Sequence, residues 1–443
     1  MLNKIVYPVL FHSLFFISFL SFGQKNRIDS LQRALKINSG EKEIRTLVAL
    51  SEEWLSYEQE NSFKYAFIAL QKAQTLNFKE GELAAKNMLG NAYLLRAEIG
   101  DIKEAYKAYQ YVLDATEKSK KENEERERAK AMSGLANIHY QWGEYKEATS
   151  MNLASLKIRE KYKDIQGEAR CYNTSGLIYD ALNDYKSAAI AYTKSLNLYE
   201  KIQKKHEIAG VLNNLAASLK LDIETSQQGN LPIDYSQVLD YYNRSLKISE
   251  EIGDKLGISR TLNNLGVLYQ SQKDTDKALK FYEKSLEVTL STESKQGLAS
   301  TYNNIAKIYR ENDQWKEALG YYEKALQTAD DAESKFELYN TLKERSSLYA
   351  EQNLFQEAYS DLLAANVLKN QLDEIENLSM VNSLNSRYEL EKAKKETALL
   401  RYQNQIKEQE QQIWWGFAGF IFVITALVAV FWYRQSQLRK NTI

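Results

Sequence analysis

The sequence predicts an all-α protein in which a solenoid of about eight helix-turn-helix units is followed by a long helix and one transmembrane helix. Three observations support this fold class. The 443 residues include only 2 prolines and 18 glycines, and the abundance of Ala, Leu, Glu, Lys and Tyr is typical of helices. A pattern of small and large side chains recurs about every 40 residues between residues 43 and 371. An uncharged apolar stretch occupies residues 413–433.

The first 23 residues have the pattern of a secretory signal peptide. Lys4 supplies the positive charge, residues 5–22 are mostly apolar, and the small residues Ser21 and Gly23 precede a cleavage site after Gly23. An uncleaved N-terminal anchor is the alternative. In both cases the following residues are translocated across a membrane, and residues 24–42 are expected to form an N-terminal helix or cap.

Residues 43–371 are expected to form the solenoid, because one small residue marks the second helix of every unit. These residues are Ala66, Ala105, Ala148, Ala188, Val238, Ala278, Ala318 and Ala358. In most units a tyrosine follows four residues later and a small residue seven residues later, which places all three on one helix face. The first helices carry a small residue and then a large one, as in Gly266 and Tyr269. The small residues should let helices approach closely while the large ones fill the space between units.

The segments LNNLGVLYQSQKDTDKALKFYEKSL (262–286) and YNNIAKIYRENDQWKEALGYYEKAL (302–326) resemble the tetratricopeptide repeat, a helix-turn-helix unit that stacks into a superhelix. The period near 40 departs from the usual value of about 34. The proline that usually ends the unit is missing, and Gly81, Gly167, Gly257 and Gly297 are expected at the turns instead. This longer form is similar to the repeats of kinesin light chains and of Rap-type peptide-sensing regulators. That resemblance implies binding of a protein or peptide ligand.

The sequence contains no pattern typical of catalysis. We find no metal-ligand spacing, phosphate-binding loop or nucleophile motif, so we expect no enzyme activity, cofactor or metal. With 58 Lys and Arg against 59 Asp and Glu, the chain has no basic field for nucleic acid. Cys171, the only cysteine, and His139, at the large-residue position of its unit, are both expected in the core.

One row of side chains is a candidate binding site. Equivalent positions in five first helices carry asparagine, namely Asn87, Asn173, Asn213, Asn263 and Asn303. In repeats of the resembled family the first helices line a concave groove. Because an asparagine amide offers one acceptor and two donors, this row predicts binding to the backbone of an extended peptide. The alternative is structural, with each amide bonding to the neighbouring helix, and the sequence leaves both open.

The fifth unit contains about ten extra residues, within 222–234. This loop is expected to project from one edge of the stack. Loops on a rigid scaffold often carry binding contacts, but surface insertions are also tolerated at little cost in stability.

Residues 372–412 predict a long juxtamembrane helix that resembles a weak coiled coil. Leu378, Leu399 and Ile406 share one heptad position, whereas Lys392 and Lys395 interrupt the seam. We expect this helix to pair two chains into a homodimer; a solvated spacer is the alternative.

Residues 413–433 would form a transmembrane helix about 31 Å long, which matches the apolar thickness of a bilayer. Trp414 and Trp432 lie near its ends, and Arg434 and Lys440 follow it. The positive-inside rule therefore predicts a cytoplasmic tail at 434–443 and periplasmic repeats, in a single-pass protein of a bacterial inner membrane.

This order of segments resembles the periplasmic input half of tetratricopeptide-repeat sensor histidine kinases and regulators of Bacteroidetes-type bacteria. The ten residues after the span are too few for an output domain. Either the output lies on a cytoplasmic partner chain, or the sequence is a truncated or degenerate sensor, or there is no signalling. The sequence thus predicts a membrane-anchored protein- or peptide-binding repeat module that serves as sensory input. The alternative is a structural scaffold or assembly factor for envelope proteins without signalling.

Overall fold

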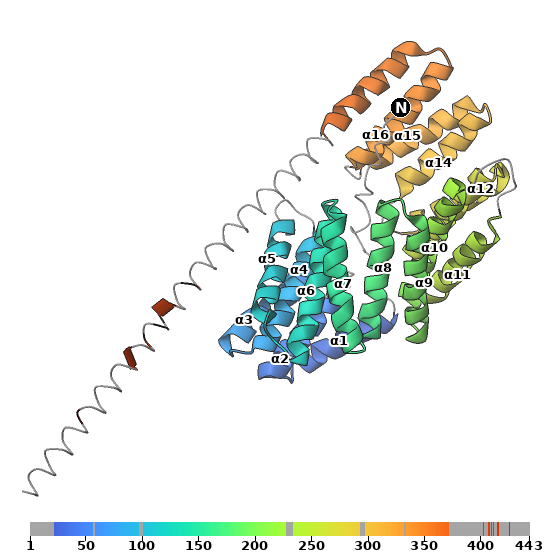
Figure 1. Ribbon diagram of the computed structural model, residues 1–443. Coiled ribbons are helices and arrows are strands. Elements are labelled where there is room, and N and C mark those ends of the chain that lie inside the picture. The colour runs from blue at the N-terminus through green and yellow to red at the C-terminus, as the bar shows by residue number, and fades with distance from the viewer. Residues whose placement is uncertain are drawn as a thin grey trace, which may run out of the picture. The chain divides into compact units, whose positions relative to one another are not determined.

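A computed structural model describes residues 22–371 except 56–57, 97–100, 227–233, 293–296 and 332–333, together with isolated positions between 402 and 425. The chain divides into two compact units between Glu376 and Asn377. The first unit is built from helices joined by short turns (Figure 1), and its described residues include no strand.

The described residues of the first unit give an N-terminal helix and eight helical hairpins. The N-terminal helix is α1 (Phe22–Leu35), and a last helix spans residues 355–371. The first helices of the hairpins are α2 (Gly40–Trp54), α4 (Lys79–Arg96), α6 (Glu122–Gln141), α8 (Ile165–Ala181), α10 (Lys205–Ser226), α12 (Lys255–Ser271), α14 (Leu298–Glu311) and α16 (Lys335–Glu351). The second helices are α3 (Gln59–Thr75), α5 (Asp101–Thr116), α7 (Tyr145–Lys161), α9 (Tyr185–Lys201), α11 (Ser236–Ile252), α13 (Thr275–Leu290), α15 (Trp315–Asp331) and the last helix.

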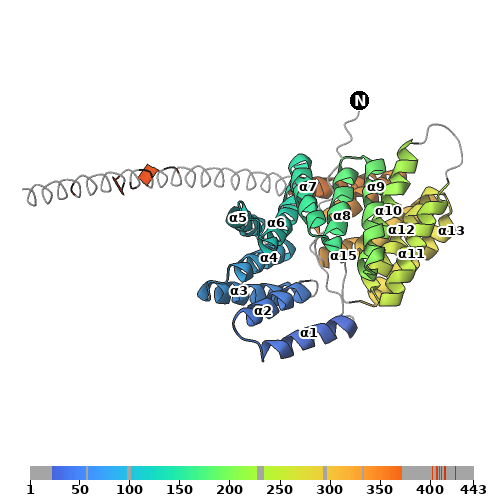
Figure 2. The ribbon, with the colours of Figure 1, turned by 60° about the horizontal axis from the view of Figure 1, so that its bottom comes forward.

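The hairpins stack side by side along the chain (Figure 2). Each helix packs on the next one, and most first helices also contact the first helix of the following unit, as α10 contacts α12 and α12 contacts α14. Second helices make no comparable contacts with each other in the described part. The first helices therefore form the shorter, inner side of the stack.

The core is built from the predicted pairs of small and large residues. Tyr192, Tyr242 and Tyr282 are fully buried. A methyl group added at Gly266 would lie 2.5 Å from the Tyr282 ring, and one at Gly176 would lie 2.4 Å from the Tyr192 ring. The prediction that small residues permit close helix approach is confirmed, because the Tyr192 and Tyr282 rings lie directly on glycines and Tyr242 packs in a cluster with Ala216.

A buried hydrogen bond fastens the two helices of a unit together. Ser195 on α9 donates to the carbonyl oxygen of Ala169 on α8 at 2.8 Å, 26 residues earlier. In the fifth unit the same bond joins Ser245 to Ala209, 36 residues earlier. The insertion therefore leaves the packing of the two helices unchanged. Its first residues extend α10 to Ser226, and residues 227–233 lie outside the described part.

The turns between units differ in part from the prediction. Gly297 has φ +75° and directly precedes α14, as expected. The prediction is wrong for Gly81, Gly167 and Gly257, which lie in the first turns of α4, α8 and α12. The left-handed residues stand four positions earlier, at Asn77, Lys163 and Gly253.

The displaced glycines have a packing role instead. An added methyl group at Gly167 would clash with Arg159 and Asp164, and one at Gly257 would clash with Asp254. Asp164 and Asp254 cap their helices by accepting hydrogen bonds from the backbone N–H of Gly167 and Gly257 at 3.0 and 2.9 Å. Glycine therefore lets the capping carboxylate lie close to the helix.

His139 and Cys171 are both buried, as predicted. None of the helices in the described part is both long and apolar enough to span a membrane. The predicted signal peptide lies almost wholly outside the described residues, and so do the juxtamembrane helix and the span at 413–433, apart from isolated positions such as Tyr402, Ile406 and Trp414. These predictions stay untested.

Candidate functional site

The candidate site is the open side of the first helices α10, α12 and α14, called here the first-helix face. On α12, Arg260 and Ser271 are exposed and Asn264 is half-buried between them. Their spacing of four and seven residues places them on one side of the helix. On α14, Asn304 and the exposed Glu311 occupy the positions of Asn264 and Ser271, and the exposed Lys307 lies on the same side of the helix.

The predicted asparagine row lies beside this face, at the contacts between successive first helices. Asn87 is buried, and its amide donates to the carbonyl and the carboxylate of Glu127 on α6 at 3.0 and 2.8 Å. Asn303 donates to the hydroxyl of Thr341 on α16 at 2.7 Å. Both asparagines therefore stabilise contacts between neighbouring first helices, while the role of the row in ligand binding stays a prediction.

Two members of the row, Asn213 and Asn263, are hydrogen-bonded to asparagines on the next first helix along the stack. Asn264 Nδ2 donates to Asn213 Oδ1 at 3.1 Å, which joins α12 to α10. Asn304 Nδ2 donates to Asn263 Oδ1 at 3.2 Å, which joins α14 to α12. Each bond uses one N–H of the half-buried Asn264 or Asn304. The remaining groups of these two amides keep hydrogen-bonding capacity for a ligand. We call these two contacts the amide pairs.

The rest of the row is less suited to direct binding. The Oδ1 atoms of Asn87, Asn173 and Asn303 are buried, and among the described residues they have no hydrogen-bond partner. Because these oxygens are closed off from solvent, a peptide lying on the surface cannot reach them. Of the predicted row, only Asn213 and Asn263 belong to amide pairs that extend onto the first-helix face.

The sequence reasoning did not single out Asn264 and Asn304 as site residues. They follow Asn263 and Asn303 directly, and neighbouring residues on a helix point about 100° apart. The sequence does contain a pattern that distinguishes Asn264 from Asn263. Asn264 is four residues after Arg260 and seven before Ser271, so it lies on the same side of the helix as these two polar residues, and that side is expected to face solvent.

A polar hollow of about 260 Å³ lies further along the first helices. Its lining consists of Glu80, Asn123, Arg126, Glu127, Lys130 and Asp164. Lys130 pairs with Glu127 at 2.7 Å, and Arg126 pairs with the neighbouring Glu122 at 2.7 Å. Because the charges neutralise each other locally, the hollow offers no concentrated field for an ionic ligand. The described residues contain no cluster of three or more metal-ligating side chains.

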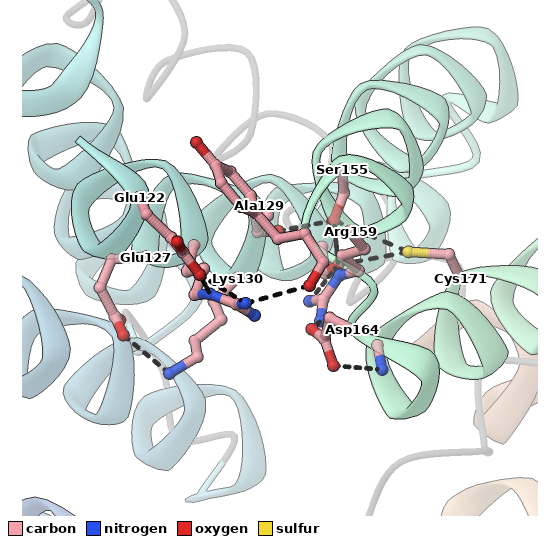
Figure 3. Close-up of polar contacts among 12 residues, drawn as sticks. Glu122, Glu127, Ala129, Lys130, Ser155, Arg159, Asp164 and Cys171 are labelled. Atoms are coloured by element: carbon pink, nitrogen blue, oxygen red, sulfur yellow. Dashed lines mark hydrogen bonds and ion pairs between the residues drawn. The ribbon is translucent and has the colours of Figure 1, made fainter. Parts of the chain in front are cut away.

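Beside the hollow, a buried arginine links α6, α7 and α8 (Figure 3). Arg159 donates to the hydroxyls of Ser155 and Ser133 at 3.0 and 3.1 Å and pairs with Asp164 at 2.8 Å. The Cys171 thiol lies 3.6 Å from the Ser155 hydroxyl. Each nitrogen of the buried guanidinium thus makes a hydrogen bond, which offsets the cost of burying its charge, and this cluster joins three successive helices of the stack.

Comparison with known families identifies the repeats. Residues 127–201 and 234–291 match one family model described as Tetratricopeptide repeat, and residues 298–329 match a second with the same description. These segments are tetratricopeptide repeats. No curated protein sequence matches the chain significantly.

Solved structures of tetratricopeptide-repeat type share the fold of the chain. The apo form of RapI is 15% identical, and the match covers 66% of this chain and 99% of that one with a TM-score of 0.51. A Rap protein complexed with Competence and Sporulation Factor is 10% identical, with 75% and 99% coverage and a TM-score of 0.52.

A signal transduction ATPase with numerous domains from Pyrococcus horikoshii, which has a tetratricopeptide repeat sensor, is 14% identical with a TM-score of 0.56. That match covers 80% of this chain and 54% of the ATPase. At such low identities the likeness describes the fold alone.

Proposed function

We propose that the repeats bind an extended peptide, or an extended segment of a protein, along the first-helix face of α10, α12 and α14. The observation that carries this proposal is the repetition of the amide pairs, Asn213 with Asn264 and Asn263 with Asn304. The similar Rap structure in complex with Competence and Sporulation Factor supports a ligand of this class.

The spacing of the amide pairs suits a peptide backbone. Packed helices lie about 8–10 Å apart, and an extended chain rises about 3.3 Å per residue. Successive amide pairs would therefore meet every third residue of an extended peptide. Since each peptide unit has one donor and one acceptor, the free amide groups of a pair can bond to the backbone without selecting side chains.

Exposed residues around the amide pairs would supply selectivity. Arg260 and Lys307 are cationic, whereas Glu311 at the end of α14 is anionic, and all three are exposed. Exposed charges of this kind act mainly on the rate and specificity of binding. Backbone contacts would thus hold the peptide while these charges select among sequences.

The binding module would act as the exported input part of a signalling system. The sequence pattern of a signal peptide at 1–23 and of a span at 413–433 supports a membrane-anchored periplasmic receptor. The output of the system would then lie on the cytoplasmic side of the membrane. A scaffold for envelope proteins would use the same binding face but would need no such output.

Site-specific photocrosslinking in cells tests the binding face. A photoreactive amino acid is placed at Ser271 on the first-helix face or, as a control, at Glu283 on α13, which is also exposed. We expect peptide or protein adducts at Ser271 and none at Glu283, identified by mass spectrometry of the crosslinked chain. Equal adducts at both positions, or adducts only at Glu283, would contradict the proposed face.

A further inference from the structure

The last helix, residues 355–371, carries an exposed apolar ridge. Phe355, Tyr359, Leu363 and Val367 follow one another at intervals of four residues, and 66%, 68%, 53% and 52% of their surfaces are exposed. Residues four apart form a continuous ridge on a helix. Contiguous exposed apolar surface of this kind usually marks an interaction site.

The ridge is more than the open end of a repeat stack. Leu362 occupies the position of Tyr282 and Tyr322, and it is 46% exposed where those tyrosines are fully buried. That exposure follows simply from the absence of a further first helix among the described residues. Leu363 and Val367 require another explanation, because the corresponding positions of earlier second helices face solvent.

Those corresponding positions are polar in the four preceding units. They are Thr193 and Asn197 in α9, Asn243 and Lys247 in α11, Glu283 and Glu287 in α13, and Glu323 and Gln327 in α15, all of them exposed. Only the last of these five second helices has apolar residues at both positions. The repeat pattern therefore does not demand Leu363 and Val367, which points to a partner for the ridge.

The ridge carries no free charge. Between residues 354 and 368 the only charged residues are Glu357 and Asp361. Asp361 is buried, and Arg345 on α16 binds both of its carboxylate oxygens at 2.7 and 2.8 Å. Glu357 lies about 200° around the helix from Phe355, away from the ridge. Two copies of the ridge can therefore face each other without like-charge repulsion.

The sequence that follows the ridge predicts the same partner. Leu399 and Ile406 share one heptad position of the helix expected at residues 372–412, and this pattern predicts pairing of two chains. A second copy of the chain carries the ridge and this pattern in the same order, so parallel pairing suits both.

We propose that Phe355, Tyr359, Leu363 and Val367 form a homodimer interface, in which the last repeat units of two chains pack in parallel on each other. The partner is a second copy of the chain. Like faces meet across a two-fold axis in such a dimer. The pair of Arg345 and Asp361 fastens the interface helix to α16, so the contact between the copies belongs to the repeat stack itself.

Disulfide crosslinking of the full chain in cell membranes tests this interface. After replacement of Cys171 by Ala, a single Tyr359→Cys substitution should give a disulfide-linked dimer in the otherwise unaltered chain. Glu357→Cys, two residues away and off the ridge, should give at least tenfold less. Absence of a dimer with Tyr359→Cys, or equal crosslinking at both positions, would overturn the proposal.

A matched pair of variants then asks whether the apolar residues drive the contact. Leu363→Glu with Val367→Gln gives the last helix the residues of α15, and it should reduce the Tyr359→Cys dimer at least tenfold. Thr193→Glu with Asn197→Gln makes the same new side chains at the equivalent positions of α9, and it should leave the dimer unchanged. Persistence of the dimer in the first variant would place the interface elsewhere and refute the proposal. Circular dichroism is used to confirm parental helicity in both variants.

Discussion

Asn264 on α12 donates a hydrogen bond of 3.1 Å to Asn213 on α10, across 51 residues of sequence. The bond joins the inner sides of two successive repeats, and Asn304 and Asn263 repeat it at 3.2 Å. The same amides thus serve the packing of the stack and, in our proposal, the recognition of a peptide. Asn213 is buried, whereas its neighbour Asn214 is only half-buried. Substitutions at these two positions therefore measure how much the bond contributes to the packing of the stack.

Replacing Asn213 by alanine should destabilise the stack. The substitution removes the acceptor of the half-buried Asn264 amide, and the net loss of one hydrogen bond costs about 0.5–1.5 kcal/mol. Asn214→Ala, one residue further along α10, is expected to cost under about 0.5 kcal/mol. Free energies of unfolding from urea titration compare the two. Equal losses would show that the bond between Asn213 and Asn264 contributes nothing specific.

Two glycines in first helices should respond to alanine in opposite directions. Gly266→Ala would place a methyl group 2.5 Å from the buried Tyr282 ring, and such overpacking costs about 1–3 kcal/mol. Gly210→Ala has no atom within 4 Å of the new methyl group, so it should gain up to about 1 kcal/mol from helix propensity. Thermal melts of the two variants provide the measurement. Changes of the same sign would show that close packing on Tyr282 is not the reason for glycine at position 266.

The stack should lose stability in acid partly through Glu125 on α6. Hydrogen bonds from Lys161 and Tyr162 lower the pKa of this carboxyl below its usual value. The folded state therefore holds the proton less tightly than the unfolded chain does. The resulting stabilisation is present above the unfolded pKa of about 4.3 and is lost as pH falls through the folded pKa.

Comparison of melting temperatures between pH 6 and pH 3 tests this dependence. Glu125→Gln removes the titrating group, so its melting temperature should fall less steeply with acid than that of the parent. Glu147→Gln, an exposed position on α7, should keep the parental slope. A parental slope in Glu125→Gln would rule out this carboxyl as a source of acid sensitivity.

The proposed topology places the repeats and the C-terminal tail on opposite sides of the membrane. A reporter enzyme that is active only in the periplasm should be active when fused after Gln412 and inactive when fused after Ile443, because the cations after the span favour the cytoplasm. Immunoblots confirm that both fusions are made in similar amounts. The reverse pattern, activity after Ile443 but not after Gln412, would invert the topology.

The sequence was sufficient to predict the repeat register. Ala278 and Tyr282 lie where their spacing predicted them, buried on one helix face, because helical periodicity directly reports which side of a helix packs. The insertion in the fifth unit is also evident in the sequence, since it lengthens one step of the repeat, but residues 227–233 of the predicted loop lie outside the described part. The pairing of the helix expected at 372–412 and the membrane span stay predictions, because the residues that carry them lie largely outside the described part.

The contacts across units could not be predicted in the same way. The bond between Asn213 and Asn264 depends on the distance and the relative rotation of two first helices. The residue pattern of one helix shows which side of that helix is buried, but it does not give the distance or rotation between two helices. The turns show a similar limit. Lys163, and not the expected Gly167, is the left-handed residue of its turn, with φ 54°. The capping bond that Asp164 accepts from the Gly167 N–H and the packing of α8 outweigh the modest local cost of a left-handed residue.

The central claim is that the amide pairs bind a peptide backbone, and one affinity comparison tests it directly. A random library of displayed 12-residue peptides is selected against the parent chain, and fluorescence anisotropy then gives the Kd of the selected peptide. We predict that Asn264→Ala with Asn304→Ala raises this Kd about tenfold. Two lost hydrogen bonds of about 0.5–1.5 kcal/mol each weaken binding by about 1–3 kcal/mol in total, and a tenfold change in Kd corresponds to about 1.4 kcal/mol. Asn243→Ala, exposed on the second helix α11, should leave the Kd unchanged. An unchanged Kd in the double variant, with its helicity intact, would contradict the proposed binding face.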